Sequence, residues 1–301
     1  MQVVQVENIT KSFGNVRAVN GVSFTVESGE ILGLIGPNGA GKTTTIRMLL
    51  DIFKPDSGSV AVLGGPMDES KKNRVGYLPE ERGLYQDISL EKCLVYLASI
   101  KGMPAALIEE RLTDYLQRFD LTEYRKRKVK DLSKGMQQKA QIITTFIHQP
   151  QLVIVDEPFS ALDPLNTQMV KDLLREERAR GTAIIMSTHQ MNQAEELCDR
   201  ILLVDKGRIM LSGPIDQIRR QFARPEILIK SSAPLPANIP GIQRIEIENH
   251  HQRAFLEAGA SPQAVLNEII QRGVLLDLFE VAQPTLDEIF IQVVTGGGTQ
   301  A

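Results

Sequence analysis

The segment from Gly36 to Thr43 reads Gly-Pro-Asn-Gly-Ala-Gly-Lys-Thr and follows the pattern G-x-x-x-x-G-K-[ST]. Glycines at this spacing let the backbone turn tightly, so that its N–H groups point at phosphate oxygens. A helix that starts after the loop adds the positive end of its dipole. The pattern predicts that Lys42 reaches the β- and γ-phosphates of a nucleotide and that the Thr43 hydroxyl ligates Mg²⁺. A short apolar strand candidate (31–35) precedes the loop and a helix candidate (43–51) follows it, which favours this interpretation over a merely glycine-rich turn.

Two carboxylates, Asp156 and Glu157, follow a second apolar strand candidate at 152–155. Open α/β sheets bind their ligands at the carboxyl ends of the strands, which is where these side chains fall. Asp156 is placed to hold Mg²⁺ through water, and Glu157 to orient or deprotonate an attacking water. Alone, the pair would indicate only a solvated strand end. Downstream of a phosphate-binding loop, it favours nucleotide hydrolysis.

With these two motifs in place, the sequence resembles the nucleotide-binding subunit of ATP-binding cassette (ABC) transporters. Five further segments match that family in the expected order, and the resemblance covers about residues 3–220. They are Lys-Ser-Phe13-Gly, Tyr77-Leu-Pro-Glu80, Leu132-Ser133-Lys134-Gly135-Met136 with Gln137 and Gln138, Ser160-Ala-Leu-Asp163, and Ser187-Thr188-His189.

The resemblance implies ATP and Mg²⁺ as the bound groups and gives each segment a role. Phe13 would stack on adenine, although a core-packing role is the alternative for this residue. Glu80 would lie near the metal at the family's Gln-loop position, and His189 would contact the γ-phosphate and the attacking water. The predicted catalytic residues are Lys42, Glu157 and His189, and the predicted metal ligands are Thr43, Glu80 and Asp156. The phosphate-loop contacts would come from Gly36, Asn38, Gly39, Gly41, Lys42, Thr43 and Thr44.

Ser133 and Gly135 occupy the signature that the family usually writes as LSGGQ. The resemblance implies that they contact ATP held by a second copy of the subunit. Ser133 also opens an apparent helix, so its hydroxyl can serve as an N-cap, and both interpretations can hold together. The chain departs from the family at Glu80, where a Gln is usual, and at Lys134 and Met136, where Gly and Gln are usual.

Composition points to a globular protein with a near-neutral balance of charge. The 301 residues carry a net charge of −3, whereas nucleic-acid-binding domains are usually strongly basic. The cation run Arg125–Lys128 with Lys130 lacks interleaved aromatics and is typical of a solvated face, so no nucleic-acid partner is expected. The two cysteines are far apart in sequence, which favours a reducing cytosol. No apolar run reaches membrane-spanning length, so a membrane role requires a partner.

Alternating strand and helix candidates predict an α/β fold with a parallel sheet. On the family resemblance, this is a P-loop NTPase core with an antiparallel β subdomain, in a cassette at 1–220 with a helical insertion at about 88–150. Apolar residues at helical spacing predict a helix at 104–119 inside the insertion. A small α+β domain is expected at 221–301, with strands at 227–230, 242–248 and 274–281. Its first helix would begin at Ser261-Pro262 and end before Gly273, and a capping box from Thr285 to Glu288 would open its last helix.

The resemblance implies an ATPase subunit that powers a separate transmembrane permease. Its partners would be permease subunits and a second ATPase subunit, with a homodimer favoured over a heterodimer. It would sit in the cytoplasm on the inner face of the cell membrane. The signature variants and the small C-terminal domain resemble those of exporter-type subunits. Two alternatives remain: a non-transport ABC ATPase that acts on ribosomes or DNA, and a P-loop kinase of a small molecule.

Overall fold

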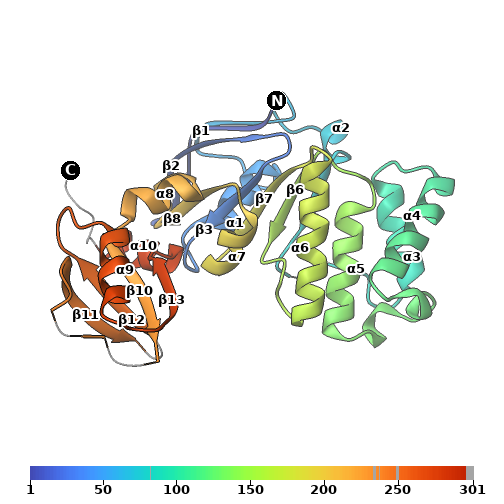
Figure 1. Ribbon diagram of the computed structural model, residues 1–301. Helices are drawn as coiled ribbons and strands as arrows, with labels where there is room; N and C mark the ends of the chain where they lie inside the picture. The colour runs from blue at the N-terminus through green and yellow to red at the C-terminus, as the bar shows by residue number, and fades with distance from the viewer. Residues whose placement is uncertain (82, 233–234, 237, 249–250, 296–301) are drawn as a thin grey trace. The chain divides into compact units, whose positions relative to one another are not determined.

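The computed structural model describes residues 1–81, 83–232, 235–236, 238–248 and 251–295 (Figure 1). Its backbone contacts divide the chain into two compact units, Met1–Ile215 and Asp216–Ala301. The sequence predicted a domain boundary after residue 220, a few residues later than this division between units. The boundary at 220 stays a prediction.

The first unit is built on two sheets. A three-stranded antiparallel sheet has the order β2-β1-β4, and a six-stranded sheet has the order β5-β6-β7-β3-β8-β9. The first five strands of the larger sheet run parallel, and β9 is antiparallel to β8. This confirms the predicted α/β fold with an antiparallel subdomain. The strands are β1 (Gln2–Phe13), β2 (Val16–Glu27), β3 (Ile31–Ile35), β4 (Ser57–Val62), β5 (Val75–Leu78), β6 (Leu152–Asp156), β7 (Ala183–Thr188), β8 (Arg200–Asp205) and β9 (Arg208–Pro214).

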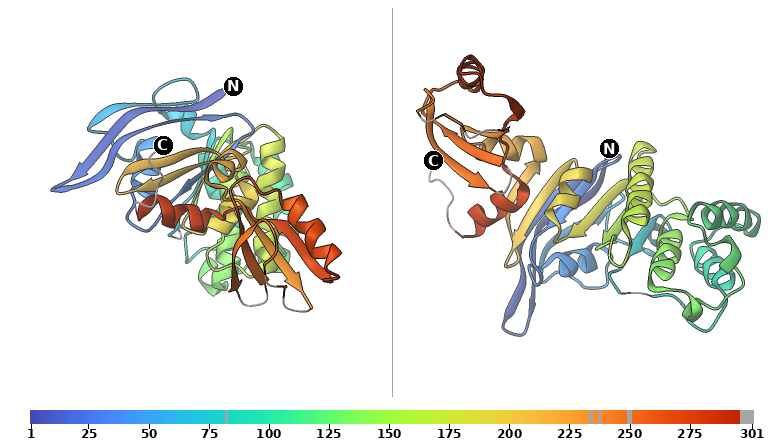
Figure 2. Two further views of the ribbon diagram at one scale, coloured as in Figure 1. Left: turned by 60° about the vertical axis from the view of Figure 1, so that its left-hand side comes forward. Right: turned by 60° about the horizontal axis from the view of Figure 1, so that its bottom comes forward.

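The helices of the first unit fall into two groups. Those that connect or flank strands are α1 (Lys42–Leu49), α2 (Glu69–Lys72), α6 (Pro164–Ala179) and α7 (Met191–Leu197). The others follow β5 and precede β6 in the sequence, and they pack beside one another, as Figures 1 and 2 show. They are α3 (Leu90–Ile100), α4 (Ala105–Arg118) and α5 (Lys134–Phe146), with the short 3-10 helices η1 (Thr122–Tyr124) and η2 (Val129–Asp131). In α4 the predicted apolar face is buried through Ile108, Leu112 and Leu116.

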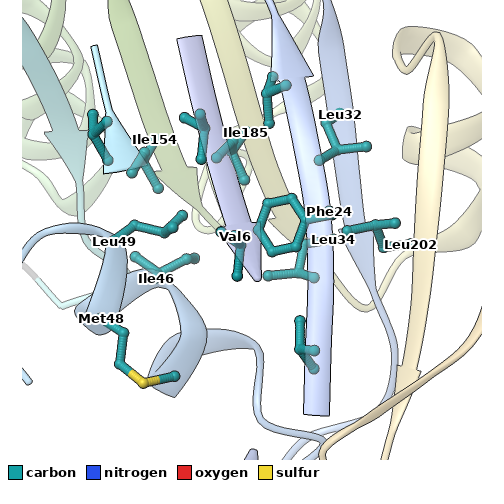
Figure 3. Close-up of a cluster of buried hydrophobic side chains, with 14 of the residues drawn as sticks. Val6, Phe24, Leu32, Leu34, Ile46, Met48, Leu49, Ile154, Ile185 and Leu202 are labelled. Atoms are coloured by element: carbon teal, nitrogen blue, oxygen red, sulfur yellow. The ribbon is translucent and has the colours of Figure 1, made fainter. Parts of the chain in front are cut away.

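The core of the first unit lies between its two sheets and α1 (Figure 3). Every residue of β3 and of β6 is buried, as expected of strands covered on both faces. Ile46 and Leu49 of α1 are fully buried in the same cluster as Leu34 of β3 and Ile154 of β6. Because α1 is anchored in this way, the loop between β3 and α1 is held at the carboxyl end of the parallel strands.

Polar side chains of α5, and of the turn after α5, form hydrogen bonds with the backbone of the edge strand β5 and of the loop after β5. Gln141, Thr145 and His148 follow one another at helical spacing. Their side-chain atoms lie 3.2 to 3.4 Å from backbone oxygens of β5 and of the loop after it. Gln141 donates to Pro79 and Glu81, Thr145 donates to Tyr77, and His148 Nε2 contacts Val75. These bonds attach α5 to the segment that contains Glu80.

The second unit contains a four-stranded antiparallel sheet with the order β11-β12-β10-β13. Its elements are α8 (Ile215–Phe222, whose first residue belongs to the first unit), β10 (Glu226–Ser231), β11 (Ile242–Glu248), β12 (His251–Leu256), α9 (Pro262–Gln271), β13 (Leu276–Val281) and α10 (Leu286–Val294). Three of the strands were predicted, whereas β12 was not. The Thr285–Glu288 capping box is present, and α9 begins at Pro262 with Ser261 in the N-cap position, as predicted, although the Ser261 side chain makes no cap bond.

No helix in the described part of the chain combines the length and the apolar character needed to cross a bilayer.

Candidate active site

The loop between β3 and α1 folds against two neighbouring backbone segments. Gly36 has φ 150°, and a Cβ there would lie 2.1 Å from the carbonyl oxygen of Val204. Gly41 has φ 107°, and a Cβ there would lie 2.3 Å from the carbonyl oxygen of Ala18. Both positions therefore require glycine. The two close approaches set the path of the loop and deliver the chain into α1.

A cavity of about 380 Å³ opens in front of this loop. Its volume falls within the usual range for small-molecule sites. The first turn of α1 borders the cavity, and the N–H groups of a helix's first turn have no acceptor inside the helix. The lining residues come from β2, the loop, α1, the segment after β5, and the end of β6: Ala18, Asn38, Gly39, Ala40, Gly41, Lys42, Thr43, Thr44, Glu80, Asp156 and Glu157.

Lys42 is only 7% exposed, and its ammonium is bonded to the loop itself. Nζ donates to the carbonyl oxygens of Gly36 at 2.7 Å and Pro37 at 3.0 Å. Burial lowers the pKa of this ammonium, against the opposing attraction of the carboxylates Glu157, Asp156 and Glu80. The cation is thus held at a cavity that also carries three carboxylates, whose charge opposes a bare anion and favours an anionic ligand that binds together with a metal cation.

Thr43 and Asp156 meet at the carboxyl end of β6. The Thr43 hydroxyl donates to Asp156 Oδ2 at 3.1 Å, and Asp156 is 2% exposed. Burial raises the pKa of Asp156, and hydrogen bonding, including that from Thr43, opposes the rise. The described residues hold no cluster of three or more His, Cys, Asp or Glu side chains that could bind a metal alone. Mg²⁺ in nucleotide sites takes one or two carboxylates together with phosphate oxygens, so the oxygens of Thr43, Asp156 and Glu80 fit that ion.

Glu157 follows directly and adopts φ 51°, a left-handed conformation that is uncommon for a residue with a side chain. Its carboxylate accepts bonds from the backbone nitrogen of His189 at 2.9 Å and from the Thr188 hydroxyl at 3.2 Å. The His189 Nδ1 atom lies 2.7 Å from the same carboxylate. The carboxylate is thereby fixed at the cavity wall, and His189 is brought to its side.

Five predicted site residues do not line the cavity: Phe13, Gly36, Ser133, Gly135 and His189. Phe13 ends β1 with its side chain 45% exposed, which rules out the core-packing alternative. Ser133 is exposed and caps α5, where its hydroxyl accepts a bond from the Met136 backbone nitrogen at 3.2 Å. The predicted N-cap role is therefore confirmed. Gly135 lies in the first turn of the same helix.

Sequence reasoning missed three residues that shape the site. Ala18 lines the cavity through β2, and no local pattern marks it. Gln141 donates to the backbone oxygens on both sides of Glu80. Its position on the helix that begins at the signature was the only sequence feature that could have indicated this contact. Thr188 bonds Glu157, and its position before His189 at a strand end was a usable signal.

Comparison with known proteins identifies the family. Residues 19–160 match the ABC transporter family. The ABC transporter ATP-binding protein YhaQ of Bacillus subtilis is 36% identical, over 97% of this chain and 98% of that protein. The chain belongs to the ABC transporter ATP-binding proteins. As such it is an ATP-binding ATPase subunit of a transporter, and subunits of this family act with separate permease subunits.

Further comparisons support this assignment, including for the C-terminal part of the chain. Residues 213–294 match the C-terminal domain of DrrA1-3-like ATP-binding proteins. The Nod factor export ATP-binding protein I of a Rhizobium species is 34% identical over 96% of both chains. A solved ATP-binding subunit of an ABC transporter superposes with a TM-score of 0.70 at 34% identity, over 73% of this chain and 93% of that one. The alternative of a P-loop kinase is not supported.

Proposed function

We propose that this ABC subunit hydrolyses ATP in the cavity beside Lys42 and that the free energy of hydrolysis drives export through a separate permease. The observation that carries the proposal is the carboxylate of Glu157, held by His189 and Thr188 at the wall of a cavity that Lys42 also lines. A fixed carboxylate next to a phosphate-binding loop is the arrangement that water activation requires. The proposed direction of transport rests on the similarity to the Nod factor export ATP-binding protein I.

Each residue of the site has a proposed role. Backbone N–H groups of the loop and of the first turn of α1 bind phosphate oxygens. Lys42 exchanges its bonds to the loop carbonyls for bonds to the terminal phosphates. Thr43, Asp156 and Glu80 are the proposed ligands of Mg²⁺, which when bound neutralises charge on the phosphates. Glu157 accepts the proton of the attacking water, and His189 contacts the γ-phosphate.

The complete site is proposed to need two chains. Ser133 and Gly135 lie outside the cavity at the start of α5, so they are free to meet nucleotide bound by a second subunit. We propose a homodimer, because one chain carries both the cavity and the signature. The subunit would lie in the cytoplasm on the inner face of the cell membrane, attached through its permease.

The test is the Mg²⁺-dependent ATPase activity of the purified chain. Lys42→Ala is expected to weaken ATP binding and abolish turnover, because it removes the cation that faces the terminal phosphates. Lys126→Ala, an exposed lysine outside the site, is the matched control and should retain wild-type activity. Wild-type turnover in Lys42→Ala would refute the site. Co-purification of the tagged chain with ribosomes rather than with membrane proteins would refute the transport role.

A further inference from the structure

Phe13 is placed at the end of a hairpin that leads into the cavity. It is the last residue of β1 and pairs with Val16, the first residue of β2. Ala18, two residues further along β2, lines the cavity beside the phosphate loop. The partly exposed Phe13 is therefore only five residues along the chain from a residue that lines the proposed nucleotide site.

A second aromatic ring is packed edge-on against Phe13. The centroid of Phe53 lies 5.4 Å from that of Phe13 with an interplanar angle of 66°, which is the favoured T-shaped arrangement. Phe53 is in turn anchored: it packs against the main core, and its backbone nitrogen donates to the Arg47 carbonyl oxygen at 3.1 Å. The Arg47 guanidinium lies 5.7 Å from the Phe53 ring centroid. Phe13 thus rests on a ring that is fixed to α1, the helix that begins at Lys42.

The backbone next to Phe13 is held to the same segment by charge. Lys11 Nζ lies 2.8 Å from Asp56 Oδ1, and the Ser12 backbone nitrogen donates to Asp56 Oδ2 at 2.7 Å. Lys11 Nζ also lies 5.8 Å from the centre of the Phe13 ring. Phe53 and Asp56 belong to the short connection between α1 and β4. This connection therefore holds both the backbone and the ring at the end of β1.

We propose that Phe53 is a positioning residue for nucleotide binding, which orients the partly exposed ring of Phe13 for stacking on the purine base of ATP. The proposal rests on the proposed function and on the contact with adenine that the family resemblance implies for Phe13. An aromatic side chain on an exposed hairpin end would otherwise lose rotamer freedom on binding, and an oriented ring avoids that loss. The T-shaped contact with Phe53 fixes the orientation of the Phe13 ring, and Phe13 stays partly exposed.

The experiment compares two ligands by isothermal titration calorimetry: ATP, which carries a base, and inorganic tripolyphosphate, which carries only the phosphates. Phe53→Leu keeps an apolar side chain in the core but removes the ring. It should weaken ATP binding about two- to tenfold, in line with the strength of an aromatic pair, and leave tripolyphosphate binding unchanged. Phe53→Tyr keeps the ring and should restore the wild-type ratio of the two affinities. Ile52→Ala, an exposed neighbour in the same turn, is the control and should change neither affinity.

Phe13→Ala separates failure of this inference from failure of the proposed function. If Phe13→Ala leaves the ratio of ATP to tripolyphosphate affinity unchanged, Phe13 does not contact the base and this inference is overturned, whereas the proposed ATPase function is overturned only by wild-type turnover in Lys42→Ala. If Phe13→Ala lowers the ratio while Phe53→Leu does not, only the positioning role of Phe53 is overturned. Equal weakening of both ligands in Phe53→Leu would show general damage to the loop and would likewise overturn it.

Discussion

Glu157 and His189 are joined by two contacts at one carboxylate oxygen: the backbone nitrogen of His189 lies 2.9 Å from it and the ring Nδ1 lies 2.7 Å from it. Because a carboxylate accepts, Nδ1 carries the proton in this arrangement, and Nε2 lies on the opposite side of the ring. The two residues follow adjacent parallel strands, in which Asp156 is paired with Ser187. The left-handed φ of Glu157 turns the chain directly after the strand.

Replacing this carboxylate tests its role as the proton acceptor. Glu157→Gln keeps the size of the side chain and its bonds to His189 but removes the base. We expect ATP turnover to fall by at least about 100-fold, the usual contribution of general-base catalysis, while ATP binding persists. Size-exclusion chromatography with Mg-ATP should then show a stable dimer. Glu110→Gln, an exposed change on α4, is the control, and normal turnover in Glu157→Gln would exclude Glu157 as the catalytic carboxylate.

Glu80 adds a negative charge to the cavity where the family usually has a neutral Gln. It lines the same cavity as Asp156, and its charge acts on Lys42. Glu80→Gln should raise the Mg²⁺ concentration needed for half-maximal ATPase activity about tenfold, which corresponds to a loss of roughly 1.4 kcal/mol of attraction for the metal. Turnover at saturating Mg²⁺ should be preserved. Glu81→Gln changes the exposed neighbour and should have no effect. An unchanged Mg²⁺ dependence in Glu80→Gln would show that this side chain does not serve the metal.

Mixing two inactive variants tests whether a site is completed by a second chain. Lys42→Ala should disable the cavity, and Ser133→Ala should disable the signature that faces the partner's nucleotide. In an equal mixture about half of the dimers are mixed, and each mixed dimer has one intact site, so up to about a quarter of wild-type activity should return. Two preparations of the same variant are the control. Activity no higher than the sum of the separate variants would indicate that Ser133 acts within its own chain or not at all.

The buried His148 should lower the free energy of unfolding in acid. Burial lowers the pKa of His148 to about 4 from an ordinary value of 6.5. Between these two values the unfolded chain binds the proton and the folded chain does not, so the free energy of unfolding is fully retained above about pH 6.5 and falls as the pH drops toward 4. The loss from this residue should reach about 2 kcal/mol at pH 5. It is measured by urea unfolding near pH 7.5 and near pH 5.

His148→Gln is the variant for this measurement, because an amide can donate to the Val75 carbonyl oxygen but does not titrate. It should lose less stability between the two pH values than the wild-type chain. His251→Gln, at an exposed histidine in the second unit, should leave the difference unchanged. Equal acid sensitivity in His148→Gln and the wild-type chain would mean that other groups account for the loss.

The sequence alone was enough to predict the phosphate loop, the parallel sheet and the order of the motifs. The loop is local: the strand before it, the glycines within it and the helix after it are consecutive, so their pattern contains most of the information. The apolar strands 31–35 and 152–155 were recognisable because strands buried on both faces have no polar positions. The last helix was marked by its own capping box, which is also a local interaction.

Tertiary structure decided the contacts between segments that lie far apart in the chain. Glu157 and His189 are 32 residues apart, and only the pairing of β6 with β7 brings them together. Strand β12 escaped prediction because the polar residues at its start conceal the alternation, and its pairing with β10 and β11 is what orders it. The edge-on packing of Phe53 against Phe13 depends on the antiparallel pairing of β1 with β4, which no local pattern records. Residue types and spacing therefore determined which chemistry is present, while strand pairing decided which side chains meet, because contacts across a sheet join residues with no fixed separation in sequence.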